Sequence, residues 1–461
     1  MARLIEAQIG NGTLSHGERA PSVRALSRSA GVSVATVNQA YLQLERRGLL
    51  EARPRSGYYV IAPRAAPAVP LTRALRNRRA RGVSSEVIDI ILESLRRDDM
   101  VVLNSAVTAF TGRLNGRLNR LTRQVLRDDP ELPNTLMVPP GDEDLRRAVA
   151  ARLGRSGRPV DPQHVVITAG TMEAIVLSLG VLCRSGDTVL VESPTYFGIL
   201  QAIEHLRLKV VEVANHPHAG IDVDAVREVV KRERVAAAVL MPSFNNPTGA
   251  VTSDADKRRL LEVLAGAGVP VVEDDIYGDL HFGDERPRTL SSFASDATVV
   301  TCGSVSKTIA LGFRIGWAVS PDHAADISRA KFCTSVASPG LQQRVLARYF
   351  ESGGYDRYLR ALRGELLVDR DRFRDVIARH FPEGTRVTNP AGGIVLWVQL
   401  PSCCDALALF HHALARRIGI APGPIFSAKA GYRNYIRLAM GVGWSPRIER
   451  ALAELGRLAD R

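Results

Sequence analysis

The stretch Gly303-Ser304-Val305-Ser306-Lys307 is followed along the chain by Gly312-Phe313-Arg314-Ile315-Gly316-Trp317. An apolar run at residues 297–302 precedes both and predicts a buried strand. A lysine among small polar residues after a strand is typical of an amine held in a cleft, where it can form an imine with an aldehyde cofactor. An ordinary surface lysine in a loop fits the same local pattern, so Lys307 alone leaves both interpretations open.

From about residue 84 onward, short apolar runs alternate with stretches of helical periodicity. The candidate strands are residues 165–168, 188–192, 209–213, 236–241, 269–273 and 299–302. This alternation predicts an α/β fold with a mostly parallel sheet. Ligands in such sheets bind at the carboxyl ends of the strands, so the residues that follow each strand are the candidates for a site.

Several strands end in residues that suit a ligand. The first leads through a glycine turn to Thr171 and Met172, at a helix start whose free N–H groups can bind a phosphate. Tyr196 can stack on a planar group, and Asn246 lies in an Asn-Asn-Pro-Thr-Gly turn. Each feature alone also has an ordinary structural explanation. Three successive acids, Glu273-Asp274-Asp275, are expected to repel one another unless one has a cationic partner.

Together these side chains match the needs of a pyridine aldehyde phosphate. Such a cofactor requires an amine, a carboxylate beside its ring nitrogen, donors to its phenolate oxygen, a stacking ring and a phosphate cup. Lys307 is the predicted amine and Asp275 the carboxylate. Tyr277 and Asn246 are the predicted donors, and Tyr196 is the ring. The predicted phosphate cup consists of Thr171, Met172, Ser304, Ser306 and Arg314, the last as a bidentate donor.

The order and spacing of these motifs resemble fold type I pyridoxal-phosphate aminotransferases across roughly residues 100–461. The resemblance implies pyridoxal 5′-phosphate as the cofactor and Lys307, Asp275 and Tyr277 as the catalytic set. It also implies that Arg437, in Asn-Tyr-Ile-Arg-Leu, binds the α-carboxylate of a substrate or effector. Met172 stands where a common family form has Gln. Leu136 stands where the family usually has a Tyr that reaches the neighbouring subunit's cofactor, and this departure bears on catalysis more than on cofactor binding.

The N-terminal segment carries most of the net charge. Residues 1–82 contain 14 arginines, no lysine and four acids, which gives +10 of the formal net charge of +13. Apolar spacing predicts three short helices, the second and third capped by Ser22 and Ser33, followed by a β-hairpin around Gly57. A basic module with its own core predicts a polyanion partner, whereas a solvated cationic tail would lack such a core.

The motifs of this segment resemble the winged helix-turn-helix of GntR-family transcriptional regulators. They are Pro21-Ser22-Val23-Arg24, Val32-Ser33-x-x-Thr36-Val37, Ala40-Tyr41-x-x-Leu44-Glu45 and Arg53-x-x-Ser56-Gly57-Tyr58. The resemblance implies binding to double-stranded DNA, with a recognition helix that begins at Ser33 and enters the major groove. The candidate DNA-binding residues are Arg24, Ser33, Thr36, Asn38, Gln39, Arg53, Arg55 and Gly57. Val34 stands where the family often has Arg, which affects the base contact expected there.

We expect a winged helix over residues 1–62, a basic Pro/Arg linker over 63–82 and an aminotransferase-like domain over 83–461, with a small subdomain from about 335. This arrangement resembles MocR-type transcriptional regulators. It implies a homodimeric, cytoplasmic bacterial protein, nucleoid-associated on DNA, that responds to an amino acid, an amine or pyridoxal phosphate through aldimine chemistry at Lys307. Two alternatives stay open: an active aminotransferase with an appended DNA-binding domain, and a repressor whose large domain only dimerises.

Other classes of protein are disfavoured by composition. No apolar run is long enough to span a bilayer, which predicts no membrane association. The five cysteines form no Cys-x-x-Cys pair, so we expect reduced thiols, no disulfide framework and no metal site.

Overall fold

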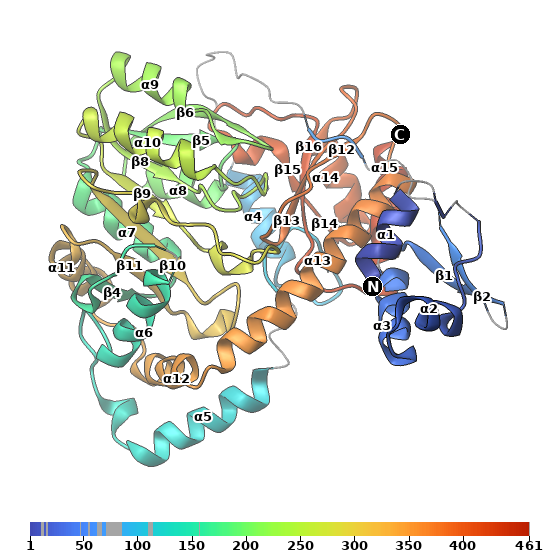
Figure 1. Ribbon diagram of the computed structural model, residues 1–461. Coiled ribbons are helices and arrows are strands. Elements are labelled where there is room, and N and C mark those ends of the chain that lie inside the picture. Colours follow the sequence, from blue (N-terminus) through green and yellow to red (C-terminus); the bar gives the residue numbers. More distant parts are fainter. Residues whose placement is uncertain are drawn as a thin grey trace.

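The computed structural model describes residues 1–10, 13–14, 17–46, 48–53, 56–61, 67–70, 85–108, 114–155 and 157–460 (Figure 1). A small N-terminal module lies beside a larger body of sheet and helices. Arg55 and most of the predicted linker at 63–82 fall outside the described residues. Among the helices of the described residues, none combines the length and the apolar character needed to cross a membrane.

The N-terminal module is a winged helix-turn-helix, as the sequence predicts. It consists of α1 (Ala2–Gly10), α2 (Val23–Ala30), α3 (Val34–Arg46), β1 (Leu50–Arg53) and β2 (Gly57–Val60), with the two strands antiparallel. Ser22 caps α2 by accepting a hydrogen bond from the Ala25 N–H at 3.2 Å. The core contains Ile5, Ile9, Val37, Tyr41, Leu44, Leu50 and Val60. Val34, where the family often has Arg, is 46% exposed on the first turn of α3, where Ala35 and Thr36 beside it are also exposed.

The large domain is built on an eight-stranded sheet of order β4-β11-β10-β9-β8-β5-β6-β7. Its strands are β4 (Val165–Thr168), β5 (Thr188–Ser193), β6 (Lys209–His216), β7 (Gly220–Ile221), β8 (Val235–Leu240), β9 (Val271–Asp274), β10 (Val299–Ser304) and β11 (Gly316–Val319). All six predicted strands form, and the pairs from β6 across to β10 are parallel. The mostly parallel α/β prediction is therefore confirmed. β11 was not predicted, and it runs antiparallel to both β10 and β4.

Helices cover both faces of this sheet. They are α6 (Glu143–Gly154), α7 (Thr171–Leu182), α8 (Phe197–His205), α9 (Val223–Arg232), α10 (Asp254–Gly266) and α11 (Ala324–Ser335). One apolar cluster joins the sheet to α7, α8 and α11, and another joins it to α9 and α10. Two further helices, α5 (Asn115–Asp128) and α12 (Gly340–Glu351), pack together at the bottom of Figure 1. The sheet is therefore buried on both faces, which leaves its strand ends to form a site.

The small subdomain has its own sheet of order β12-β13-β16-β15. Its elements are α13 (Gly354–His380), β12 (Arg386–Val387), β13 (Val395–Gln399), α14 (Ala406–Ala415), β14 (Ile418–Gly419), β15 (Ala421–Pro422), β16 (Tyr435–Ala439) and α15 (Pro446–Ala459). Two earlier elements join it: α4 (Ser85–Ser94) contributes Val87 and Ile91 to its core, and β3 (Val101–Val102) pairs with β14.

The division between the subdomains falls within α13, later than the predicted position near residue 335. The half of α13 that carries Leu359, Leu362 and Leu366 packs with the large domain, as α12 does. The half that carries Phe373 and Ile377 packs in the small-subdomain core. Because α13 spans 27 residues, one helix bridges both cores.

Candidate functional site

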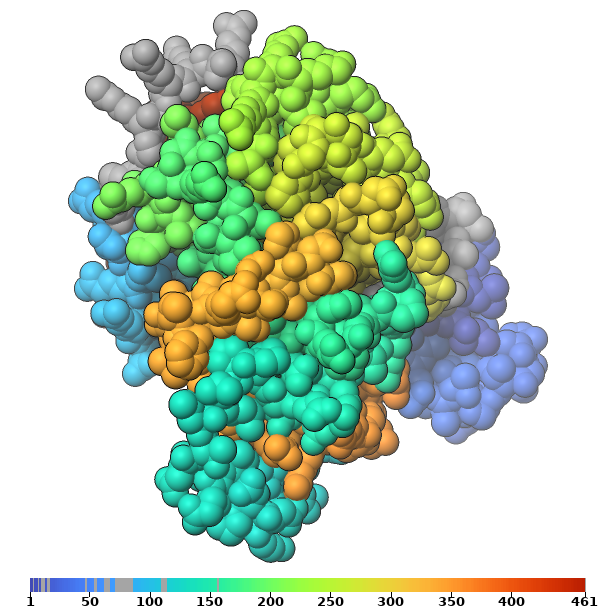
Figure 2. Space-filling view, turned by 90° about the vertical axis from the view of Figure 1, so that its left-hand side faces the viewer, coloured from blue at the N-terminus to red at the C-terminus, as the bar shows by residue number. Residues whose placement is uncertain are grey.

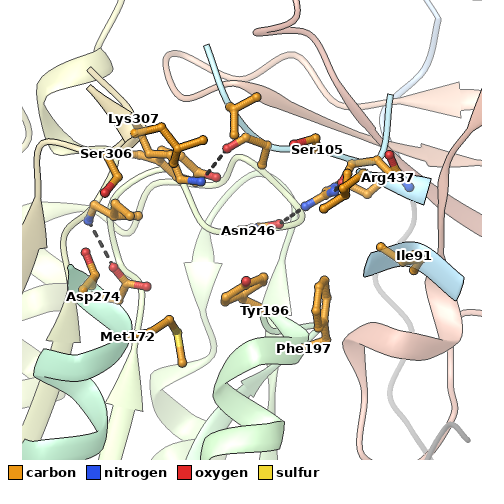
Figure 3. A pocket seen from close by; sticks show the side chains of 18 of the residues that line it. Ile91, Ser105, Met172, Tyr196, Phe197, Asn246, Asp274, Ser306, Lys307 and Arg437 are labelled. Atoms are coloured by element: carbon orange, nitrogen blue, oxygen red, sulfur yellow. Dashed lines mark hydrogen bonds between the residues drawn. The ribbon is translucent and has the colours of Figure 1, made fainter. Parts of the chain in front are cut away.

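A cavity of about 340 Å³ lies where the carboxyl ends of the large-domain strands meet α4 and β16 (Figure 3). The predicted site residues that line it are Thr171, Met172, Tyr196, Asn246, Tyr277, Ser306, Lys307, Arg314 and Arg437. Asp275 and Ser304 do not line it. Although the predicted residues come from strands far apart in the sequence, the fold brings nearly all of them to one cavity.

Lys307 lies in the turn after β10. The Ser304 hydroxyl accepts a hydrogen bond from the Ser306 N–H at 3.0 Å and shapes this turn. The Lys307 Nζ donates to the Ala106 carbonyl at 2.6 Å (Figure 3). Burial, together with the charge of Arg437, lowers the pKa of Lys307 to about 8. A much larger fraction of this amine than of an ordinary lysine is therefore unprotonated and nucleophilic near neutral pH.

Asp274, not the predicted Asp275, faces the cavity. Side chains alternate along a strand, so Asp274 at the end of β9 points away from the side taken by its neighbours Glu273 and Asp275. Asp275 instead forms a buried ion pair with Arg286, which also binds Asp279 at 3.0 Å. The expectation that one of the three acids has a cationic partner is thus fulfilled by Asp275. Burial raises the pKa of Asp274 to about 7, although the charge of Lys307 and a hydrogen bond from the Ile276 N–H act in the opposite direction.

The start of α7 forms a small polar cup. Gly170 has φ +99°, and a Cβ there would lie 2.6 Å from the Arg314 Nη2, so the glycine makes room for the guanidinium. Arg314 donates to the Ala169 carbonyl at 2.9 Å and to the Ser306 hydroxyl at 3.3 Å. The Thr171 Oγ1 is buried and has no hydrogen-bond partner within the described residues. An orphaned hydroxyl, a guanidinium and a helix N-terminus fit a bound phosphate.

Ser304 does not belong to the phosphate cup, although the sequence predicted it there. Its hydroxyl donates to the Ile315 carbonyl at 2.8 Å and lies 2.7 Å from the Ser306 hydroxyl, so it supports the turn from below. Ser304 is the last residue of β10 and pairs with Gly316 of β11, so its backbone is held in the sheet, whereas Ser306 lies in the turn that follows.

Arg437 is buried on β16 at the opposite side of the cavity. Its Nη1 donates to the Asn246 Oδ1 at 3.4 Å and its Nη2 donates to the Asn104 carbonyl, but its Nε has no partner among the described residues. Glu192 holds the Asn246 turn by accepting from the Asn245 Nδ2 at 2.7 Å. A buried guanidinium with no carboxylate partner suits a ligand carboxylate.

Other lining residues were missed by the sequence interpretation. Phe197, Gln201 and the segment 104–107 line the cavity, as do Ile91, Leu92 and Leu95 on and just after α4. No local pattern in the sequence places α4 or Ala106 at this cavity, since Ala106 lies 201 positions from Lys307. Leu136, the departure from the family pattern, is 63% exposed and does not line this chain's cavity.

The predicted DNA-contact residues lie on the winged helix. Arg24, Thr36, Asn38 and Gln39 are exposed. Ser33 acts as the N-cap of α3, since its Oγ accepts from the Thr36 N–H at 3.1 Å and bonds the Thr36 hydroxyl at 2.8 Å. The exposed side chains of α2 and α3 therefore form the candidate DNA-reading surface.

The predicted wing residues differ in their surroundings. Arg53 is exposed but pairs with Glu51 at 3.2 Å and lies over the Tyr59 ring. Gly57 begins β2 with φ +103°, a conformation that favours glycine. Thr36 and Gln39 also border a hollow shared with Val368 of α13.

Comparison with known proteins matches both parts of the chain. The aminotransferase class I and II family matches residues 114–455, and the gntR family of bacterial regulatory proteins matches residues 1–60. The uncharacterized HTH-type transcriptional regulator YdcR of Escherichia coli is 35% identical over 463 residues, covering 99% of this chain and 98% of YdcR. The 2-aminoadipate transaminase of Thermus thermophilus is 33% identical over 343 residues, covering 72% of this chain and 83% of the transaminase.

A solved structure extends this comparison to the fold. LysN, the α-aminoadipate aminotransferase of Thermus thermophilus, was crystallised with N-(5′-phosphopyridoxyl)-L-leucine. It superposes with a TM-score of 0.73 at 28% identity, covering 82% of this chain and 98% of LysN.

Proposed function

The chain belongs to the aminotransferase class I and II family and, through its gntR-family module, has the arrangement of MocR-type transcriptional regulators; from that membership we propose that it is a DNA-binding regulator that holds pyridoxal 5′-phosphate around Lys307 and responds to an amine. The observation that carries the proposal is the cavity itself. It joins a partly buried lysine whose pKa is lowered to about 8, a buried carboxyl group on Asp274, and two polar side chains, Thr171 and Arg437, with atoms that have no partner among the described residues.

The residues present fit the cofactor. When bound, pyridoxal phosphate supplies an aldehyde carbonyl that condenses reversibly with amines. Lys307 is the amine that we assign to this carbonyl, and Asp274 is the carboxylate that we assign to the ring nitrogen. Tyr277 and Asn246 are assigned to the phenolate oxygen, and Tyr196 to the ring face. The phosphate is assigned to Thr171, Ser306, Arg314 and the start of α7.

The charged groups of the cavity limit the chemical class of effector that it can bind. Lys307, Arg314 and Arg437 are the cations among its described lining residues, and Asp274 is the acid. The assigned roles use all of them, with Arg437 binding the effector's carboxylate. The wall formed by α4 and Phe197 then meets the effector's side chain with apolar groups. We therefore propose an amino acid with an uncharged side chain, and the leucine adduct of LysN is a precedent in a related protein.

The linker offers a route from the cavity to the DNA-binding module. The Ala68 carbonyl accepts a hydrogen bond from the Val387 N–H of β12 at 2.8 Å, and Pro70 is buried. Pro67 contributes to a small hollow with Ile377 and Phe381. The described part of the linker thus lies on the small subdomain, which also supplies α4 and Arg437 to the cavity. An effector that favours one position of this subdomain changes the position of the DNA-binding module.

The competing function is an active aminotransferase with an appended DNA-binding domain. The polar residues that line the cavity and the similarity to a transaminase favour it, whereas Met172 and Leu136 depart from the family pattern. The two functions differ in what the N-terminal module contributes. Steady transamination that is unaffected by deletion of residues 1–82 would favour the active aminotransferase over the regulator.

The test combines absorption and DNA binding on the full chain. We expect added pyridoxal phosphate to give a visible absorption band, and an uncharged amino acid such as leucine to shift it. The same amino acid should change the affinity for DNA from upstream of the protein's own gene. A shifted band with unchanged DNA affinity contradicts the regulatory proposal, and no band at all contradicts cofactor binding.

A further inference from the structure

We propose that an arginine stripe on α5, formed by Arg120, Arg123 and Arg127, is a second, sequence-independent contact to DNA phosphates. The proposal rests on the DNA-binding function proposed above. It adds a surface that lies on the aminotransferase-like body, outside the winged helix. Figure 2 shows the segment around α5, at the bottom of the view, standing out from that body.

The three arginines share one face of the helix. At 100° per residue, positions 120, 123 and 127 fall within about 60° of one another. The buried residues Leu118 and Val125 lie on the opposite face, and all three arginines are exposed. With a rise of 1.5 Å per residue, the stripe is about 10 Å long. It is therefore a compact cationic ridge that one stretch of a nucleic-acid backbone can follow.

No acid of the described residues neutralises the charges of the stripe. Asp128 is the only acid of α5, and it pairs with Arg348 of α12 at 2.5 Å. The remaining arginine of the helix, Arg117, donates to Ser352 and lies over the Tyr349 ring. In the part of the chain that the structure describes, Arg120, Arg123 and Arg127 make no ion pair.

The arginines of α5 lack the acid partners that several other helices provide. Exposed arginines there pair with an acid three or four positions away, as in Arg147–Glu143, Arg227–Asp224, Arg232–Glu228, Arg329–Asp326, Arg379–Asp375 and Arg457–Glu454. Other exposed helix arginines, such as Arg357, Arg360 and Arg450, also make no ion pair among the described residues, but they do not form a run of three on one face. Like charges at these spacings destabilise a helix. On α5, each of the arginines instead has another arginine three or four positions away. An external polyanion offsets this repulsion, and DNA is the polyanion that a chain with a winged helix meets.

Arginine is suited to this role, because its guanidinium binds phosphate with two parallel hydrogen bonds. Contacts to phosphates carry no sequence information, but they release counterions and so increase affinity in a salt-dependent way. The stripe therefore predicts a DNA footprint that extends beyond the segment covered by the winged helices.

The test uses the full chain and a random-sequence duplex of about 60 base pairs, with binding followed by fluorescence anisotropy at several salt concentrations. The variant replaces all three arginines by glutamine (R120Q, R123Q, R127Q). Each phosphate contact contributes about 0.9 to the slope of log K against log [salt], so we expect the slope to fall by about 2.7. The affinity at 0.1 M salt should fall on the order of 100-fold.

Two further variants serve as controls. R120K, R123K, R127K keeps the charges and should keep most of the slope. R227Q, R232Q, R329Q removes the same number of charges from paired positions and should leave the slope unchanged.

The proposal is overturned if the glutamine variant keeps the parent's slope, or if it changes the sedimentation coefficient while the slope stays the same, which would make the stripe a protein interface. If the parent itself does not bind DNA, the failure lies in the proposed function and not in the stripe alone.

Discussion

The cavity around Lys307 and the winged helix around α3 use charge in opposite ways. The cavity holds few charged groups, and the pKa values of Lys307 and Asp274 are displaced toward neutrality by burial. The winged helix carries many arginines, and the described ones assigned to DNA are exposed. Buried charges act individually because little solvent screens them, whereas exposed charges act as a sum. Single substitutions should therefore abolish a property of the cavity but only weaken a property of the winged helix.

Lys307→Ala should have the largest effect. Without the amine, the visible band of cofactor bound through this lysine should disappear, and the DNA affinity should no longer respond to an amino acid. Lys231→Ala is the matched control, because Lys231 is exposed and pairs with Glu228 on α9. Absorption spectra of the parent, Lys307→Ala and Lys231→Ala proteins measure this effect. A Lys307→Ala protein with the parent's band removes Lys307 from its assigned role.

Arg437→Met comes next. Removing one partner of a buried charge pair costs about 2–5 kcal/mol, so the affinity for an amino-acid effector should fall at least 30-fold, by a rough conversion. The absorption band of the cofactor should remain, because Arg437 is assigned to the effector alone. Arg433→Met is the control, since Arg433 is exposed and pairs with Asp405. Titration of the band with leucine measures the difference, and equal affinities in the two variants would assign the carboxylate to another group.

Asp274→Asn tests the corrected assignment through pH. Burial raises the pKa of Asp274 above its unfolded value, to about 7. The folded state therefore holds this proton more tightly, and the carboxylate lowers stability progressively as the pH rises from about 4 to 7. In the cofactor-free protein, Asp274→Asn should melt a few degrees higher than the parent at pH 8 and show little difference at pH 4. Its affinity for pyridoxal phosphate should fall at the same time.

Asp275→Asn is the comparison variant for Asp274→Asn. It leaves Arg286 buried with Asp279 as its remaining carboxylate, so the melting temperature should fall. Thermal melts with and without cofactor separate the two acids. If Asp275→Asn loses cofactor binding while Asp274→Asn keeps it, the ring-nitrogen assignment returns to Asp275.

The same two regions show which features of the fold and of the site could be predicted from the sequence. The strands around Lys307 and the caps at Ser22 and Ser33 are local patterns, and the structure has them where they were expected. The assignment of Asp275 was wrong by one position within the run Glu273-Asp274-Asp275. The period of two along β9 distinguishes them, and that period was available in the sequence.

Other features depend on contacts that no local pattern encodes. The wall formed by α4 reaches the cavity through the packing of Val87 and Ile91 in the small subdomain, more than 200 positions before Lys307. Arg286 pairs with Asp275 across a loop that carries no regular period. The strand β11 is a short segment of glycine, tryptophan, alanine and valine, and it follows the turn that contains Arg314 and runs antiparallel to β10.

Arg24→Gln should have the smallest effect and brings the comparison back to the winged helix. Arg24 is exposed at the start of α2, and we assign it one phosphate contact among several, which the substitution would remove. The slope of log K against log [salt] should decrease by about 0.9, and the affinity at 0.1 M salt should fall by no more than about tenfold. Arg53→Gln is the internal control, because Arg53 is already shared between Glu51 and the Tyr59 ring and should lose less. Complete loss of DNA binding in Arg24→Gln would contradict the additive picture, because it would show that this module also depends on one charge, as the cavity depends on Lys307.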